Sequence, residues 1–183
     1  MQVEIREAIG SDFQAISGVV LSAFGNKEGP AIVQLIADLL AYESAQPVLS
    51  LVALIDKRIV GHIFFSKASV NNSGGEISAS LLAPLAVHTD FQSQRIGGQL
   101  ITEGLKQLSR SGIKLVFVLG HPDYYPKFGF SEAGIMGFDA PYPIPQKNTA
   151  AWMVQELHPG IFKSISGRVI CADALDDPKL WRE

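Results

Sequence analysis

Residues 82–101, which read LAPLAVHTDFQSQRIGGQLI, decide how the chain is expected to fold. An apolar run ends, a polar loop follows, and apolar residues then recur at helical spacing. This pattern predicts a strand, a short loop and a helix over residues 95–110 that opens at the pair Gly97-Gly98. Pro84 cannot donate a hydrogen bond within a sheet, so we expect a bulge or a local splaying of the strand at that point.

The start of this helix has the properties of an anion site. Its first N–H groups have no partners inside the helix, and the helix dipole adds positive potential. Gly97 and Gly98 have no side chain that would keep a ligand away from the backbone. A glycine pair at a helix start is also a common packing device, so both interpretations stay open. The segment is neither a P-loop nor a dinucleotide-binding fingerprint, because the glycine spacing of both motifs is absent.

Two helices are expected before this stretch, over residues 13–24 and 31–42, after a short first strand near Val3. Each shows apolar residues on one face. Gly25 and the pair Gly29-Pro30 interrupt the helical pattern, and we therefore expect two separate helices rather than one.

The other apolar runs predict one mixed α/β sheet within a single domain that covers residues 1–183. Turn signals at residues 56–58 and 71–75 join neighbouring strands. From about residue 131 onward, the chain is expected to add strands and an extended loop. The strands after the first are predicted at residues 48–55, 59–69, 76–88, 115–119, 151–157 and 167–172.

The composition excludes several classes of protein. Hydrophobic residues make up 47% of the chain, which is enough for a core, and the formal net charge is −3. The 15 Lys and Arg residues are scattered, so no nucleic-acid partner is expected.

No apolar run approaches the ~20 residues of a membrane-spanning helix, and the first residues do not resemble a signal peptide. The single cysteine, Cys171, allows no internal disulfide and is expected to pack in a strand, so a cytoplasmic protein is expected.

Three segments together resemble one known family. They are Leu85-Ala86-Val87 followed by Phe91-Gln92-x-x-Arg95-Ile96-Gly97, the run Tyr124-Tyr125-Pro126-Lys127-Phe128-Gly129-Phe130 after an apolar strand, and Ile59-Val60-Gly61-His62-Ile63. In these segments the chain is similar to the GNAT acetyltransferases, and in particular to the YhbS-type branch of predicted GNAT enzymes. The resemblance covers residues 3–130, and the tail also looks like that branch.

The resemblance implies the GNAT fold, an α/β (α+β) fold in which helices flank a mixed, mostly antiparallel central sheet. It also implies an N-acetyltransferase that moves an acetyl group from acetyl-CoA to a primary amine by direct attack in a ternary complex, without a metal. The strand residues would line the acetyl and pantetheine groups, and the loop amides would cradle the pyrophosphate. The implied cofactor-binding residues are Leu85, Ala86, Val87, Gln92, Ser93, Gln94, Arg95, Ile96, Gly97, Gly98, Tyr124 and Phe128.

One position departs from the family pattern, because Arg95 stands where the family has its first loop glycine. A backbone amide makes the contact there, so an arginine is expected to fit with a negative φ and with its side chain directed away. Its guanidinium either pairs with a phosphate or is solvated at the helix start.

The resemblance implies catalytic roles for three residues. The N–H of Val87, beside the irregularity at Pro84, would donate to the developing oxyanion. Tyr125, at the family's tyrosine position, would donate a hydrogen bond or a proton to the departing thiolate. The alternative for Tyr125 is an amphipathic core residue with a satisfied hydroxyl. His88 is a candidate general base.

The general base is not identified by the residues themselves, because the strand over residues 81–87 carries no carboxylate. The candidates besides His88 are His121, Glu76 and His62. A chain of water molecules is an alternative, and a site that binds the free amine would need no base.

The acceptor is not defined beyond a small amine or a peptide amine. Residues 24–42 and the loop around Tyr142 are expected to meet it. Two interpretations stay open beside the enzyme: a catalytically silent acyl-CoA-binding module that acts as a sensor or interaction domain, and a structural domain in which the glycine pair only packs. Strands at the C-terminal end would allow two chains to pair as a homodimer.

Overall fold

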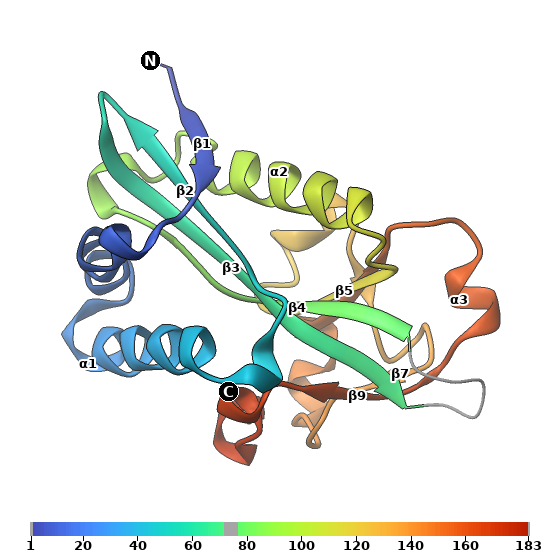
Figure 1. The fold of residues 1–183 in the computed structure, drawn as a ribbon. Helices are drawn as coiled ribbons and strands as arrows, with labels where there is room; N and C mark the ends of the chain where they lie inside the picture. The colour runs from blue at the N-terminus through green and yellow to red at the C-terminus, as the bar shows by residue number, and fades with distance from the viewer. Residues whose placement is uncertain (1, 72–76, 183) are drawn as a thin grey trace.

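A computed structural model describes residues 2–71 and 77–182 (Figure 1). The described residues form one nine-stranded sheet in the order β1-β2-β3-β4-β5-β8-β6, in which β9 pairs with β3 and β7. Its pairs are antiparallel except for β4 with β5 and β7 with β9. The strands are β1 (Glu4–Glu7), β2 (Leu49–Ile55), β3 (Arg58–Asn71), β4 (Ile77–Val87), β5 (Leu115–Leu119), β6 (Ser131–Glu132), β7 (Phe138–Asp139), β8 (Trp152–Glu156) and β9 (Gly167–Cys171).

Helices cover both faces of this sheet, as the sequence predicts (Figure 1). The helix α1 (Phe13–Ala41) packs on one face through residues such as Ile16, Val20 and Leu39. The helix α2 (Ile96–Arg110) packs on the other through Leu100 and Ile101. The short α3 (Ile161–Ser164) lies in the C-terminal part. The mixed, mostly antiparallel sheet between helices confirms the expected fold class.

The parting of β4 from β5 positions the site. These parallel strands pair only from Ala79 to Leu81 on β4, although β4 continues to Val87. On its other side β4 stays paired with β3, and that register shifts where Ile63 and Phe65 face Leu85 and Leu82. The shift confirms the irregularity expected at Pro84. The last residues of β4 therefore have a strand neighbour on one side only.

The two predicted N-terminal helices are confirmed as two helical segments, which the label α1 covers together and which meet at a kink at Gly25. This residue has φ 80° and ψ 178°, whereas the residues on both sides are helical. The second segment is helical directly after Gly25 rather than from residue 31, so the break expected at Gly29-Pro30 is wrong. A Cβ on Gly29 would lie 2.8 Å from Cδ2 of Leu21, which precedes the kink. Gly29 thus lets the two halves of α1 pack closely. Pro30 lies five residues after Gly25, early in the second half.

Of the two turns predicted between strands, the structure describes the first. Asp56 and Lys57 both have positive φ (49° and 66°), as a two-residue hairpin turn between β2 and β3 requires. The turn predicted at residues 71–75 lies almost wholly outside the described residues, which resume at Ile77. Within the described ranges, no helix has an apolar stretch long enough to span a bilayer.

Gly104 on α2 provides a test of the packing between α2 and β3. A Cβ at this position would lie 2.5 Å from Cζ of Phe65, a ring with 0% exposure. Gly104→Ala is therefore expected to lower the free energy of unfolding by about 1–3 kcal/mol, despite the better helix propensity of alanine. Urea denaturation measures the change.

Gly18→Ala is the matched control for this variant. Gly18 also lies in a helix, and no atom lies within 4 Å of the position that a Cβ would take there. Here alanine is expected to raise the free energy of unfolding by about 0.5–1 kcal/mol. Equal stabilisation by both substitutions would contradict the close contact between Gly104 and Phe65.

Candidate active site

A cleft of about 1260 Å³ opens where β4 parts from β5. The end of β4, the loop before α2, the first turns of α2 and the short helix at Tyr125–Phe128 form its walls. Of the residues predicted to bind the cofactor, Gln94 alone does not line it. Those that line it are Leu85, Ala86, Val87, Gln92, Ser93, Arg95, Ile96, Gly97, Gly98, Tyr124 and Phe128.

The end of β4 offers unpaired backbone groups to this cleft. The N–H of His88 donates to the carbonyl oxygen of Val60 on β3 (N···O 2.8 Å). Backbone groups alternate in direction along an antiparallel strand, so those of Val87 and Leu85 point away from β3, toward the gap left by β5. The Val87 carbonyl accepts a hydrogen bond from Nε2 of Gln92 (2.9 Å), which ties the loop to the strand. The Val87 N–H remains directed into the cleft.

The loop before α2 adopts a conformation that gathers N–H groups. Ser93 (φ 63°) and Arg95 (φ 66°, ψ 14°) are both left-handed, and Arg95 is the residue that precedes the first helical residue of α2. The expected negative φ of Arg95 is wrong: this position requires the left-handed conformation that a glycine adopts freely. No side chain caps the start of α2 in the described structure, so its first N–H groups are available to an anion.

The glycine pair also has a packing role. A Cβ on Gly97 would lie 2.7 Å from the Tyr124 hydroxyl, and a Cβ on Gly98 would lie 2.8 Å from Cε1 of Phe128. Tyr124 and Phe128 form an edge-to-face pair with ring centroids 5.2 Å apart. The two glycines therefore allow an aromatic wall to stand directly against the start of α2, and they line the cleft themselves.

Tyr125 lies behind this wall and does not line the cleft. Its side chain is 8% exposed, and its ring packs against Phe130 and against Gly120, the residue that follows β5. Burial raises the pKa of Tyr125, and the neighbouring Tyr124 raises it further. The hydroxyl therefore stays protonated at physiological pH and can act as a donor but not as a base.

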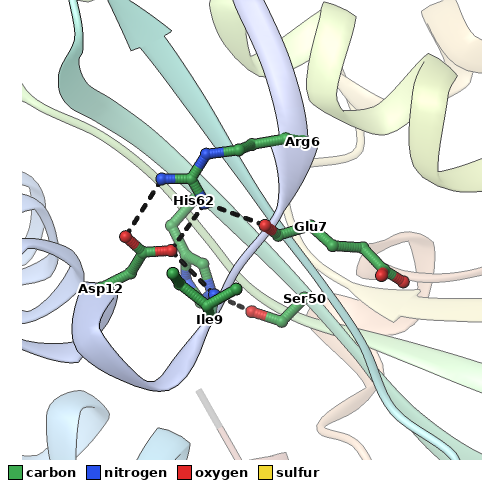
Figure 2. Close-up of polar contacts among 6 residues, drawn as sticks. All are labelled: Arg6, Glu7, Ile9, Asp12, Ser50 and His62. Carbon is green, nitrogen blue, oxygen red and sulfur yellow. Dashed lines mark hydrogen bonds and ion pairs between the residues drawn. The ribbon is translucent and has the colours of Figure 1, made fainter.

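The four candidate bases lie in different environments. His121 lines the cleft. His62 is buried, its Nε2 lies 2.9 Å from Oγ of Ser50 (Figure 2), and burial lowers its pKa to about 4, so it is neutral at physiological pH. His88 lines a separate cavity, and its Nδ1 accepts from the N–H of Asp90 (3.2 Å). Glu76 lies outside the described residues.

Sequence reasoning missed part of the lining. Thr102 and Glu103 lie one helical turn beyond Gly98 and Gln99, so their spacing on the helix could have placed them beside the loop. Of the segment expected to meet the acceptor, Phe24 lines the cleft, whereas Tyr142 donates to Asp176 elsewhere (2.8 Å). The sequence did not predict cofactor contacts for the other residues that line the cleft, which are Ile5, Ala23, Phe24, Phe91, Gln99, Thr102, Glu103, His121 and Lys127.

Comparisons with known proteins show similar sequences over most of the chain. The family model described as Acetyltransferase (GNAT) domain matches residues 4–133. Over 165 residues the chain is 42% identical to the Uncharacterized N-acetyltransferase YjhQ of Escherichia coli (strain K12), and the match covers 89% of this chain and 88% of that protein. It is 30% identical over 166 residues to YhbS of the same strain, with 90% and 93% covered.

Solved structures show the same similarity. The crystal structure of the GNAT family N-acetyltransferase YhbS from Escherichia coli in complex with CoA matches with a TM-score of 0.85 and 28% identity, over 97% of this chain and 93% of that one. A GNAT family acetyltransferase from Brucella melitensis in complex with acetyl-CoA matches with a TM-score of 0.70 and 30% identity, over 96% and 99%.

The left-handed Arg95 provides a test of the loop geometry. Arg95→Gly is expected to raise the free energy of unfolding by about 1 kcal/mol, because glycine adopts φ 66° without a steric cost. Arg110→Gly at the other end of α2 is the control, and it is expected to lower the same quantity by up to about 1 kcal/mol. Destabilisation by Arg95→Gly, measured by urea denaturation, would contradict the loop conformation.

Proposed function

Because this chain belongs to the GNAT family of acetyltransferases, we propose that it transfers an acetyl group from acetyl-CoA to a primary amine by direct attack within a ternary complex. The observation that carries the proposal is the junction of two features in one cleft: the open edge of β4 and the uncapped start of α2. A single elongated ligand with an amide-rich arm and an anionic end matches both features.

The residues of the cleft suit the parts of acetyl-CoA. Backbone groups of Leu85 and Val87 are available for the pantetheine amides, because β5 does not pair with them. The left-handed loop and the N–H groups at Gly97 and Gly98 suit the pyrophosphate. YhbS and the Brucella protein, whose structures share this fold over nearly the whole chain, hold CoA and acetyl-CoA respectively.

In the proposed reaction acetyl-CoA supplies a thioester carbonyl. The Val87 N–H donates to the carbonyl oxygen as negative charge develops there, an interaction that contributes about 3 kcal/mol to transition-state binding in comparable sites. The strand holds this donor in place, because the neighbouring His88 N–H is bonded to Val60. No movement of the backbone is then required during the reaction.

Tyr125 is proposed to stabilise the departing thiolate. Its raised pKa keeps the hydroxyl protonated, so it donates a hydrogen bond to the sulfur. Attack by the neutral amine creates an ammonium in the tetrahedral intermediate, and this ammonium gives its proton to the departing thiolate as the amide forms. The ring lies against Gly120, where β5 ends and the gap between the strands opens. His121 is the candidate base that lines the cleft, and we assign it the role of accepting the extra proton of a protonated amine before the attack.

Gly97→Glu tests the cofactor site. The new side chain would collide with the Tyr124 hydroxyl and would place a negative charge at the proposed pyrophosphate cradle. Calorimetric titration with acetyl-CoA is expected to show no binding. Gly134→Glu is the control, because no atom lies within 4 Å of a Cβ at that glycine, and it should bind like the unmodified protein. Normal binding by a folded Gly97→Glu protein would place the cradle elsewhere.

Tyr125→Phe tests the catalytic assignment. The variant is expected to keep its affinity for CoA and to lose about tenfold or more in turnover, measured by thiol release with the best amine from a screen. Tyr124→Phe is the matched comparison, because its hydroxyl lines the cleft. Unchanged turnover in Tyr125→Phe together with a loss in Tyr124→Phe would transfer the role to Tyr124.

An acyl-CoA-binding sensor without catalysis is the second candidate function. The observation in its favour is that Tyr125 does not line the cleft. Acetyl-CoA binding without turnover of any amine in the screen would support the sensor over the enzyme.

A further inference from the structure

A second cavity, of about 440 Å³, lies on the α1 side of the sheet beside the turn between β2 and β3. It shares no lining residue with the large cleft. Its charged and titratable lining residues are Arg6, Asp12, Lys57, Arg58 and His88, which come from four separate parts of the chain. Apart from His88, which the resemblance offers as a candidate base, no lining residue of this cavity has a catalytic or cofactor-binding role described above.

The lining carries more positive than negative charge. Asp12 is its acidic residue, and it is already paired: Arg6 donates to both carboxylate oxygens (2.8 and 3.1 Å), and the N–H of Ile9 donates to one of them (2.8 Å; Figure 2). Lys57 and Arg58 form no ion pair with any residue of the described ranges. Two cations of the lining are therefore without a carboxylate, in a protein whose formal net charge is −3.

Two hydrogen-bond donors face each other at the edge of this cavity. Nδ1 of His88 accepts from the N–H of Asp90, so the neutral imidazole carries its proton on Nε2. Nε2 lies 3.5 Å from Nη2 of Arg58, which is also a donor. In the other tautomer, Nδ1–H would face the N–H of Asp90 and the Asp90 carboxylate, whose Oδ2 lies 3.8 Å from Nδ1. An acceptor placed between Nε2 and the guanidinium would satisfy both donors.

The position of the Arg58 guanidinium is fixed from the opposite side. It lies over the ring of Phe91, 5.4 Å from the ring centroid, in a cation–π contact. The lining of the cavity also includes the apolar residues Val19, Leu54 and Ile59. A ligand that fits must therefore present an acceptor at the rim and an apolar body to the wall.

We propose that this cavity binds a small organic carboxylate. Its planar oxygens match the donors of Arg58, Lys57 and His88 Nε2, and its apolar part contacts Val19, Leu54 and Ile59. The proposal does not depend on acetyl transfer, because the cavity and the large cleft have separate linings.

Titration of the ¹⁵N-labelled protein with sodium benzoate, followed by NMR at constant ionic strength, tests the proposal. We expect saturable shifts of the amide signals of Lys57, Arg58 and His88. The double variant Lys57→Gln/Arg58→Gln is expected to bind about tenfold more weakly or worse. The control Lys106→Gln/Arg110→Gln removes the same charges from α2, on the opposite face of the sheet, and should bind like the unmodified protein.

Two further probes separate the contributions of the rim and the wall. Benzamide, which has the same apolar body without the charge, is expected to bind at least about tenfold more weakly than benzoate. Inorganic phosphate, which has charge without an apolar body, is also expected to bind more weakly. The proposal would be overturned if benzoate gave no saturable shifts, or if the folded double variant bound benzoate undiminished. It would also be overturned if benzamide bound as tightly as benzoate, or if phosphate bound more tightly.

Discussion

The parting of β4 from β5 beyond Leu81 is the constraint on which the rest of the structure depends. A strand with one neighbour presents a row of unpaired N–H and C=O groups, which a buried position cannot leave unsatisfied without cost. Here β3 stays paired with the other edge of β4 as far as Val87, past the register shift near Pro84, so the open edge stays accessible. The loop that follows is tied to that edge through Gln92. An extended ligand with amide groups can complete the sheet where β5 leaves it, and the start of α2 then receives its anionic end.

On one side of this opening, aromatic rings pack directly against glycines, and this packing forms the wall of the site. Gly97 and Gly98 let Tyr124 and Phe128 stand against α2, and Gly120 lets the Tyr125 ring lie at the end of β5. The loop between the strand and the helix contains two left-handed residues that are not glycine, Ser93 and Arg95. This conformation costs on the order of 1 kcal/mol at each residue and is typical of functional loops, where it directs N–H groups toward a ligand. The site therefore combines tight packing with local backbone strain.

The order of elements could be predicted from local patterns in the sequence, whereas most of the residues that line the cleft were expected from the resemblance to the GNAT family. The strand, loop and helix over residues 82–101 follow from hydrophobic periodicity, and the glycine pair marks the helix start that lines the cleft. Features that depend on distant packing could not be predicted in this way. Gly29 lies against Leu21 across the kink at Gly25, the left-handed Arg95 contradicted the expected φ, and the second cavity joins Arg6, Arg58 and His88 from separate segments. The burial of Tyr125 behind Tyr124 also depends on such packing.

The central claim is that acetyl-CoA binds along the open edge of β4, and amide hydrogen exchange of individual residues tests it most directly. The N–H groups of Leu85 and Val87 point into the gap, whereas the intervening Ala86 is paired with β3. NMR measurements with and without acetyl-CoA should show slower exchange for Leu85 and Val87 when the ligand is bound, and protection of Ala86 in both states. Unchanged exchange of Leu85 and Val87 in the complex would contradict the account, because the ligand would then bind without using the edge that the fold leaves open.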